Sequence, residues 1–358
     1  MDIIDCFGTP RLRGLSHGEA LRGQIAQSLA AWEVATMAGL GERAPKDIDT
    51  YCAQFLADTT LIQTAEAQTP DLMTELRGIA EGAGQPLARV AVYNLMDEQW
   101  WYDAAITAPP PGCSLIAQPV SGGHVLAQNM DLPAHMEGSQ VALRLGGADM
   151  AQTIVLSAAG MIGLTGANAA GLAIGVNTLL MLHHASAGLP VAFAMRHALG
   201  ARDSKAAQAR LAGVQHASGQ HYALATRAGI TSLECSATSC TPLAVPDSGR
   251  LLHTNHPLAS TDIDATALAR LGSGGFTQSS SLRLAWLDRR QDSIASAGDI
   301  QALFDDADAP LCMRAKTNGG SSTFATVHYT LGDRTSVRMR QGIAGSAAWQ
   351  EVAFLEAA

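Results

Sequence analysis

The chain has 358 residues, of which 47% are hydrophobic and 15% charged, and its formal net charge is −9. This length allows two or three domains or one large α/β unit, and the hydrophobic fraction is enough for a substantial core. The acidic balance argues against nucleic-acid binding, which needs a basic face.

The six cysteines are scattered along the chain, so no disulfide framework is predicted and reduced thiols are expected. Cys235 and Cys240 are too far apart in sequence for the usual zinc-knuckle spacing, and no second pair exists. Residues 1–5 lack the basic region and apolar stretch of a signal peptide, and no apolar stretch is long enough to span a membrane. The expectation is a soluble cytoplasmic protein with no membrane or nucleic-acid partner.

The first hundred residues have a helical pattern. Ser16 and Glu19 fit a capping box, and apolar residues follow at helical spacing, namely Leu21, Ile25, Leu29 and Trp32. Another helix is predicted after Pro45, and the next begins at Thr69-Pro70 with an N-cap and a proline at its first position. A fourth helix is predicted over about residues 86–99.

Residues 104–111 are predicted to form an exposed linker, after which the pattern changes to strands. The predicted strands are 114–118, 124–128, 141–145, 153–157, 172–176, 222–226 and 231–235, with further strand sequence from 322 to 339. Helices are predicted over 190–198, 204–213, 281–290 and 300–304. Two groups of strands with helices between them favour a layered α/β sandwich over alternating βαβ units.

Gly112-Cys113 stands where the helical pattern gives way to strands, directly after three prolines. This arrangement is expected where a chain cleaves itself, because the thiol can attack the Gly112 carbonyl and glycine leaves that carbonyl uncrowded. Cleavage would make Cys113 a new N-terminus that carries a nucleophile and an amine able to act as its base. The alternative is a buried cysteine that serves as a small hydrophobic residue, as most free cysteines do.

Two charged residues are candidate partners of Cys113. Asp131 ends the second strand of the predicted hairpin, where an antiparallel pairing brings it toward Cys113 and lets it hold the new α-ammonium group. The alternative for Asp131 is a turn aspartate. Arg283 follows serines that can cap a helix, so it is expected in the first helical turn, where the helix dipole disfavours a cation. Pairing with Asp131 is one explanation for an arginine there.

The segment 253–256 contains two histidines three residues apart. No acidic or cysteine partner accompanies them, so neither a metal nor a cofactor is expected. Asn255 suits an oxyanion donor, since its side-chain N–H groups are neutral. The glycine-rich stretch 160–172 matches neither GxGxxG nor a P-loop, and Gly-x-Ser-x-Gly is absent, which disfavours a serine hydrolase of the α/β type.

Taken in order, these motifs resemble those of the isopenicillin N acyltransferase family of N-terminal nucleophile hydrolases, the acyl-coenzyme A:6-aminopenicillanic acid acyltransferase group. The motifs that carry the resemblance are Gly8-Thr9-Pro10, Arg13-Gly14, His17-Gly18-Glu19, Gly112-Cys113, Gln128-Asn129-x-Asp131, Gly163-x-x-Gly166-x-Asn168-x-x-Gly171-Leu172, Thr254-Asn255-His256 and Ser281-x-Arg283. The resemblance covers most of the chain.

The resemblance implies an α+β fold, a four-layer αββα sandwich of the N-terminal nucleophile hydrolase type with a helical N-terminal segment. It also implies autocatalytic cleavage at Gly112-Cys113, which would leave a heterodimer of an α chain, residues 1–112, and a β chain, residues 113–358.

The family's site residues map onto five positions of this sequence. Cys113 would be the nucleophile, Asn255 would serve the oxyanion hole, and Asp131 and Arg283 would be the polar pair near the nucleophile. Asn177 is placed in the site through its backbone, by analogy with bile salt hydrolases and penicillin V acylases.

The function implied is an amidohydrolase or acyltransferase that cleaves or transfers the acyl group of a small amide or short peptide through a Cys113 thioester, without a cofactor. Two alternatives stay open: a dedicated hydrolase of short peptides or β-alanyl-type conjugates, and an uncleaved, non-catalytic binding protein. Met130 and Leu132 stand where the family often has aromatic residues, so the acyl pocket is expected to differ. Homo-oligomerisation also stays open.

Overall fold

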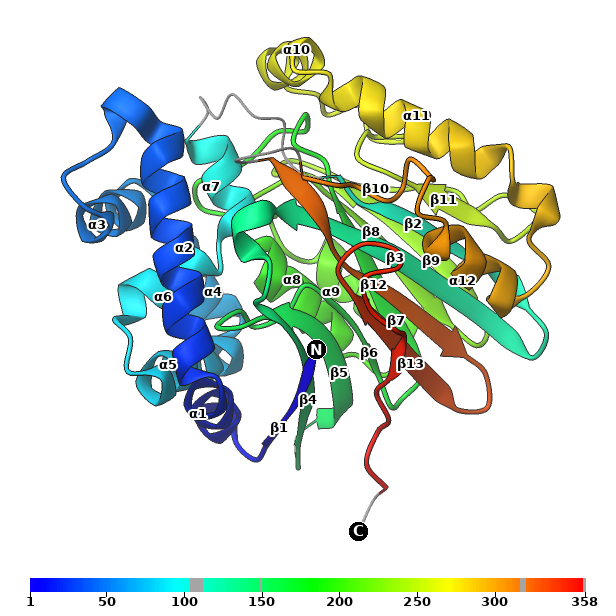
Figure 1. Cartoon of the computed structure of the whole chain (residues 1–358), viewed down its shortest axis with the longest axis horizontal. Helices are drawn as coiled ribbons and strands as arrows, with labels where there is room; N and C mark the ends of the chain where they lie inside the picture. The colour runs from blue at the N-terminus through cyan, green and yellow to red at the C-terminus, as the bar shows by residue number, and fades with distance from the viewer. Residues whose placement is uncertain (104–111, 149, 316–319, 357–358) are drawn as a thin grey trace.

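Two β-sheets pack face to face, and helices cover their outer faces (Figure 1). The computed structural model describes residues 1–103, 112–148, 150–315 and 320–356. The larger sheet has the strand order β1-β4-β5-β6-β7-β8-β9-β10, and the smaller has the order β11-β2-β3-β12-β13-β14. Helices α8 and α9 pack on the larger sheet and α11 and α12 on the smaller. The predicted four-layer αββα sandwich of the α+β class is therefore confirmed.

Some neighbouring strands are consecutive in the sequence and form hairpins, whereas others pair although they lie far apart in the sequence. The larger sheet contains β1 (Asp2–Phe7), β4 (Gln140–Gly147), β5 (Met150–Ala158), β6 (Thr165–Asn168), β7 (Leu172–Thr178), β8 (Gln220–Thr226), β9 (Gly229–Cys235) and β10 (Cys240–Pro242). The smaller contains β2 (Ser114–Val120), β3 (Gly123–Pro133), β11 (Leu251–His253), β12 (Ser321–Leu331), β13 (Thr335–Gln341) and β14 (Gln350–Glu351). The predicted hairpin between strands 114–118 and 124–128 is confirmed, and the strands predicted on either side of residues 227–229 and within 322–339 also pair as antiparallel neighbours.

The helices fall into an N-terminal group and two outer layers. The N-terminal group is α1 (Pro10–Ala20), α2 (Arg22–Leu40), α3 (Ile48–Asp58), α4 (Leu61–Gln68), α5 (Pro70–Ala83), α6 (Leu87–Tyr93) and α7 (Met96–Tyr102). The outer layers are α8 (Val191–Leu199) and α9 (Ser204–Ala212), and α10 (Ala265–Ser273), α11 (Phe276–Asp288) and α12 (Ala297–Asp305). No helix among the described residues has the length and apolarity needed to cross a bilayer.

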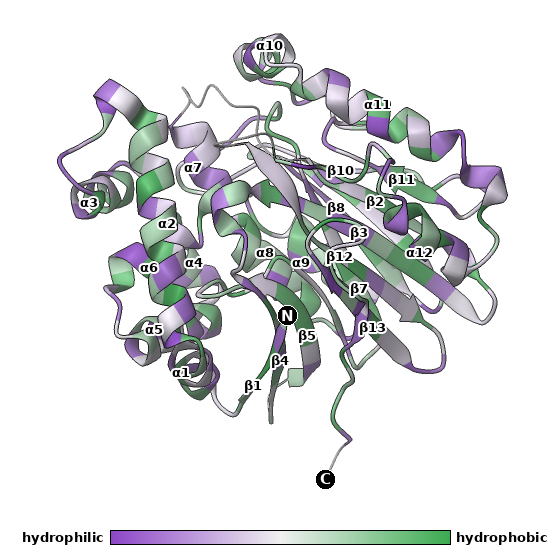
Figure 2. Ribbon diagram, in the orientation of Figure 1, coloured by the Kyte–Doolittle hydropathy of each residue, from purple (hydrophilic) through white to green (hydrophobic). Residues whose placement is uncertain are grey.

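The core follows from the alternation of side chains along each strand. In β2, Leu115 faces the larger sheet, whereas Ile116 packs outward against α11 and α12. Gly175 of β7 lies where the sheets approach closely, since a Cβ added there would lie 2.9 Å from Oε1 of Gln128. The Gln128 side chain hydrogen-bonds both backbone groups of Val176, which ties β3 to β7. Hydrophobic residues occur in strands of both sheets and along the N-terminal helices (Figure 2).

The N-terminal helices pack beside the sandwich, with α1 against α5 (Figure 1). A Cβ added to Gly14 would lie 2.8 Å from the backbone nitrogen of Ile79, so glycine in the N-terminal motif allows the two helices to approach closely. The segment is not wholly helical, because β1 pairs parallel with β4 at the edge of the larger sheet. This strand was not predicted from the sequence, because it is only six residues long and has aspartates among its apolar residues.

Three local predictions were wrong at helix boundaries. Helix α1 begins at Pro10 with Thr9 as its N-cap, so Ser16 lies inside the helix and forms no capping box. The helix predicted over 86–99 is two helices, and the Asn94 side chain at the break bonds Gly160 and Ile162. Helix α11 begins after Gly275, whose φ is +77°, so Arg283 lies in the middle of the helix rather than in its first turn. The predicted linker 104–111 lies outside the described residues.

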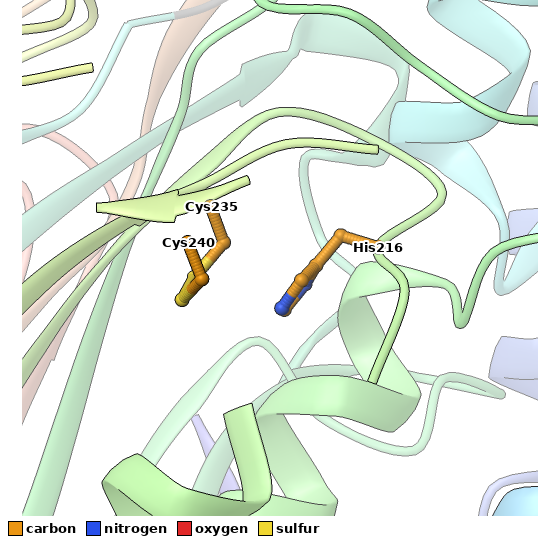
Figure 3. Close-up of side chains that lie close together, drawn as sticks. All are labelled: His216, Cys235 and Cys240. Carbon is orange, nitrogen blue, oxygen red and sulfur yellow. A yellow bond between two sulfur atoms is a disulfide. The ribbon is translucent and has the colours of Figure 1, made fainter. Parts of the chain in front are cut away.

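The expectation of reduced thiols was wrong for one pair. Cys235 and Cys240 face each other across β9 and β10 and form a disulfide, with His216 beside them (Figure 3). The ligand atoms of the three residues lie within 4.8 Å of one another. The sulfurs are bonded to each other, however, and the His216 ring bonds the Leu211 carbonyl and the Tyr222 hydroxyl. The cluster therefore offers no set of free metal ligands.

Candidate active site

Cys113 lies immediately before β2, at one end of the smaller sheet. Ser114 pairs with Asn129 of β3, and Leu115 pairs with His253 of β11. Because both pairings are antiparallel, residues near the end of β3 and directly after β11 reach the end of the sheet where Cys113 lies. Asp131 is thus brought toward Cys113 through the hairpin, as the sequence predicted.

The Arg283 guanidinium connects the backbone at Cys113 to the chain after β11. Its Nη1 donates to the Cys113 carbonyl at 2.5 Å and to the Ser114 hydroxyl at 2.9 Å, and its Nη2 donates to Oδ1 of Asn255 at 2.9 Å. Arg283 is only 2% exposed. The suggested direct pairing of Arg283 with Asp131 is not what the structure shows, although the arginine charge acts to lower the pKa of Asp131.

Asp131 has one engaged and one free carboxylate oxygen. Oδ1 accepts hydrogen bonds from Nδ2 of Asn129 at 2.7 Å and from the Thr323 hydroxyl at 2.6 Å. Oδ2 is buried and has no hydrogen-bond partner in the described part of the chain. Burial raises the pKa of Asp131 to about 7, against the opposing effects of Arg283, Thr323 and Asn129. A buried acceptor without a partner is suited to receive a new donor.

The Cys113 thiol is buried beside this carboxylate. Its Sγ lies 4.0 Å from Sδ of Met130. Burial, and after it the negative charge of Asp131, raise the pKa of the thiol to about 12, while Arg283 acts to lower it. The thiol is therefore protonated at neutral pH in the intact chain, and any reaction through it needs a base.

Gly112 and Asn255 complete the surroundings of the peptide bond before Cys113. The Asn255 backbone N–H donates to the Ser280 hydroxyl at 2.8 Å, and its side-chain Nδ2 donates to the Thr178 carbonyl at 3.1 Å. A Cβ added to Gly112 would lie 2.9 Å from Cζ of Arg283 and 3.1 Å from Oδ1 of Asn255. This close approach requires glycine at position 112.

Asn177 lies on β7, but its side chain points elsewhere. Its Oδ1 lies 2.9 Å from Nδ1 of His221, and its buried Nδ2 has no partner among the described residues. The flanking residues Val176 and Thr178, rather than Asn177, line the cavity that contains Cys113. The backbone role expected of Asn177 stays a prediction.

The residues that fix the segment carrying Asn255 were not predicted from the sequence. Oε1 of Glu234 lies 2.9 Å from Nε2 of His253, and the carboxylate also accepts backbone N–H groups of residues 258–260. The His253 ring stacks on that of His221, with centroids 3.6 Å apart. His253 is thus engaged in holding the chain after β11, and no local motif indicates its pairing with a glutamate on β9.

A small cavity of about 40 Å³ adjoins the thiol. Residues from several parts of the fold line it, including Asp97 and Trp100 of α7, Met130 and Leu132 of β3, and Val176 of β7. Met130 and Leu132 are the positions at which the sequence predicted a pocket unlike that of the family. Most of the lining is apolar, so the cavity suits the acyl part of a small molecule.

Two packed sheets covered by helices on both outer faces define a four-layer αββα fold, and in this chain a buried cysteine directly precedes strand β2 of the smaller sheet. The model of the acyl-coenzyme A:6-aminopenicillanic acid acyl-transferase family matches residues 121–342, and the chain belongs to that family. The membership predicted from the motifs is confirmed. Acyl transfer and amide hydrolysis are the reactions that membership supports.

The chain is similar to the acyl-coenzyme A:6-aminopenicillanic-acid-acyltransferase 40 kDa form of Emericella nidulans, with 26% identity over 256 residues, covering 71% of this chain and 69% of that protein. Penicillin V acylase from Agrobacterium tumefaciens has a TM-score of 0.40 and 13% identity, covering 67% of this chain and 86% of that one. A variant of conjugated bile acid hydrolase from Clostridium perfringens has a TM-score of 0.35 and 10% identity. That match covers 68% of this chain and 98% of the hydrolase chain.

Proposed function

We propose that this chain is a self-processing cysteine amidohydrolase or acyltransferase that acts on a small amide or short peptide. The observation that carries the proposal is the arrangement at Gly112-Cys113, where Arg283 holds the Cys113 carbonyl and a glycine lies against both Arg283 and Asn255. In self-processing, Sγ of Cys113 attacks the Gly112 carbonyl and the C–N bond breaks, which leaves a thioester and a free Cys113 amine. Water then hydrolyses the thioester and leaves Gly112 with a carboxylate.

Turnover by the mature enzyme would use the same thiol. The freed α-amine has a pKa near ~8, so part of it is neutral at neutral pH and can take the thiol proton. The thiolate attacks the substrate carbonyl, and the developing oxyanion accepts a hydrogen bond from Nδ2 of Asn255, a type of contact worth roughly 3 kcal/mol. The protonated leaving amine departs, and water or an acceptor amine resolves the acyl-enzyme.

After cleavage, Asp131 would bind the new N-terminus at Cys113. Its free Oδ2 would accept a hydrogen bond from the α-ammonium group that cleavage creates, and Arg283 keeps the Cys113 carbonyl in place. The mature protein would be a heterodimer of residues 1–112 and 113–358. A buried ion pair between Glu75 of α5 and Arg196 of α8 would hold the two chains together.

Intact mass under denaturing conditions tests the proposal. The wild-type protein should yield fragments 1–112 and 113–358, and Cys113→Ala should stay whole. Cys312→Ala is the matched control, since Cys312 is also a free cysteine, and it should cleave as the wild type does. An uncut wild-type protein that hydrolyses amides would contradict the mechanism, and an uncut chain whose Cys113 resists iodoacetamide would favour the binding-protein alternative.

Acyl transfer and hydrolysis differ in the molecule that accepts the acyl group, and an assay can distinguish them on that basis. Amide substrates are assayed with and without an acyl thioester donor and an acceptor amine. A new amide product identifies a transferase, whereas free acid alone identifies a dedicated hydrolase of short peptides or conjugates.

A further inference from the structure

The disulfide between Cys235 and Cys240 forms, with His216, a second cluster of reactive side chains (Figure 3). None of the three residues lines the cavity beside Cys113. Each contributes one ligand atom, and these atoms lie within 4.8 Å of one another. While the S–S bond is intact, neither sulfur is a free ligand. Reduction of that bond would leave two thiols beside an imidazole.

The backbone keeps the two cysteines side by side without the help of the disulfide. Cys235 and Cys240 are directly opposite each other in the antiparallel pair of β9 and β10, so both side chains leave the same face of the sheet. The turn between them is closed by its own hydrogen bonds. The Ser236 N–H donates to the Ser239 carbonyl at 2.7 Å, and the Ser236 hydroxyl accepts from the Ser239 N–H at 3.1 Å. The thiols would therefore stay adjacent after reduction.

His216 is fixed on the segment between α9 and β8. The N–H of Ala217, next along the chain, donates to the Leu189 carbonyl at 3.0 Å. The His216 ring is 1% exposed, with Nε2 donating to the Leu211 carbonyl at 2.9 Å and Nδ1 lying 3.3 Å from the Tyr222 hydroxyl. A histidine that binds a metal through one nitrogen is commonly oriented by a hydrogen bond at the other. Whichever nitrogen binds an ion here, the other one keeps a partner.

The donor set of the reduced cluster suits zinc. Two thiolates and an imidazole are ligands that favour Zn²⁺ over Mg²⁺ and Ca²⁺. Zn–S bonds of about 2.3 Å and Zn–N bonds of about 2.0 Å put the ligand atoms of a tetrahedral site roughly 3.5–3.8 Å apart, a spacing that small side-chain rotations reach here. The two thiolates would balance the charge of the ion, so the complex could be buried at little electrostatic cost. The described residues supply three ligands of these kinds, and water would fill the fourth position.

We propose that Cys235 and Cys240, once reduced, bind Zn²⁺ together with His216, so that the cluster is a redox-gated zinc site. A dithiol reductant would break the S–S bond by thiol–disulfide exchange and leave as its own disulfide, which yields two protein thiols. Binding of Zn²⁺ then forms two Zn–S bonds and one Zn–N bond and releases two protons to the solvent. Cys113 takes no part, so the zinc site is independent of the proposed function.

Zinc would replace the disulfide as the cross-link of the hairpin between β9 and β10, and it would add a link to the segment before β8. The turn of this hairpin also supports the chain after β7, since the Ala237 N–H donates to the His183 carbonyl at 3.0 Å. The Thr238 hydroxyl donates to Oδ2 of Asp262 at 2.5 Å. Zinc should therefore stabilise the reduced protein, and it should leave the oxidised protein unaffected.

Co²⁺ is the probe for the site, because tetrahedral Co²⁺ thiolates absorb light whereas the filled d shell of Zn²⁺ makes its complexes colourless. The full-length Cys113→Ala chain is used, since the N-terminal cysteine that cleavage would create could chelate the ion itself. The protein is reduced with dithiothreitol, freed of it by anaerobic gel filtration and titrated with Co²⁺ beside the unreduced protein. The reduced protein should bind a single Co²⁺ and show a thiolate-to-cobalt charge-transfer band that Zn²⁺ abolishes. The oxidised protein should show no band.

Variants in the same chain locate the ion. Cys240→Ser, at a half-buried position, should lose roughly half of the band and bind Co²⁺ at least roughly tenfold more weakly. Cys312→Ser is the matched control, because Cys312 is a free cysteine that is also half-buried, and it should keep the band and the affinity. His216→Gln should keep both thiolates and therefore the band, but its affinity should also fall at least roughly tenfold.

Several results would overturn the zinc site. These are the absence of a band in the reduced protein, equal bands in the oxidised and reduced proteins, and unchanged binding in Cys240→Ser. If the variants do not fold, thermal unfolding of the Cys113→Ala chain decides the question. Zn²⁺ should raise the Tm of the reduced protein by several degrees and leave that of the oxidised protein unchanged. Equal shifts, or no shift in either form, would contradict the proposal.

Discussion

Nη2 of Arg283 donates a 2.9 Å hydrogen bond to Oδ1 of Asn255, while Nη1 of the same guanidinium holds the Cys113 carbonyl. This contact fixes the orientation of the Asn255 amide, because its oxygen faces a donor and its Nδ2 must point the other way. One buried cation thus positions both the backbone of the proposed nucleophile and the proposed oxyanion donor. The peptide bond to be cleaved lies against both.

Gly112→Ala should slow self-cleavage by at least an order of magnitude. The added Cβ would lie within 3.1 Å of Oδ1 of Asn255 and 2.9 Å of Cζ of Arg283, so the guanidinium or the chain must move. The measurement is a time course of intact mass after denatured protein is returned to folding conditions.

Gly229→Ala is the control for this variant, since a Cβ added there meets no atom within 4 Å. It should cleave at the wild-type rate. Cleavage of Gly112→Ala as fast as Gly229→Ala would show that the close packing at position 112 is irrelevant to the reaction.

The parts of this site that the sequence predicted are those with local signals. The turn between β2 and β3 is marked by Ser121 and two glycines, and this hairpin alone brings Asp131 toward Cys113. Asn255 and Arg283 were candidates by residue type, but only the family resemblance grouped both with Cys113, since β11 and α11 approach Cys113 only in the folded chain. Thr323 and Asp97 carry no motif.

The predicted start of helix α11 was wrong for a related reason. Serines 279–281 look like N-caps, but tertiary packing of Phe276 extends α11 toward its N-terminus. The resulting shift moves Arg283 from the first turn to the helix middle, where it points at Cys113. A capping preference worth about 1 kcal/mol is easily outweighed by burial of an aromatic side chain.

Asp131→Asn, made in the uncleavable Cys113→Ala chain, should change how stability depends on pH. Burial raises the pKa of Asp131 from 3.8 to about 7, so between these values the native state binds more protons than the unfolded state. The free energy of unfolding of the parent should therefore fall, relative to the variant, as pH rises from about 4 to about 7, by up to about 4 kcal/mol. Above that range the difference should be constant.

Denaturant unfolding at several pH values measures this difference. Asp333→Asn, at an exposed turn, should run parallel to the parent across the range. Parallel curves for Asp131→Asn as well would mean that the carboxyl at position 131 keeps an ordinary pKa in the folded protein.

Glu75→Gln should weaken the hold of the N-terminal helices on the sandwich. Glu75 accepts from Arg13 at 3.1 Å and from Arg196 of α8 at 2.9 Å, and all three side chains are buried. Loss of the shared carboxylate should cost about 3–5 kcal/mol, because two buried cations lose their common counter-charge. Glu66→Gln, which removes an exposed ion pair with Arg77, should cost about 1 kcal/mol or less in the same unfolding assay. Equal losses would contradict this account.

Glu234→Gln should lower kcat more than it raises KM. Glu234 touches neither Cys113 nor the cavity, but its carboxylate binds His253 and the backbone of residues 258–260, on either side of Asn255. Burial acts to raise the pKa of Glu234, yet the hydrogen bonds from His253 and the backbone lower it, so the group is ionised at neutral pH. A neutral amide cannot accept all of these bonds, and the segment carrying the oxyanion donor should loosen.

The expected size of this effect is a tenfold or greater loss of kcat, since misplacing one oxyanion donor costs up to roughly 3 kcal/mol. Steady-state kinetics with one amide substrate gives the separate values of kcat and KM. Glu137→Gln serves as the control, because Glu137 is exposed and its carboxylate accepts a 3.4 Å hydrogen bond from the Ser322 hydroxyl. An effect of Glu234→Gln on KM alone would place the glutamate in substrate binding, whereas a loss of kcat with unaltered KM would identify it as the residue that positions Asn255.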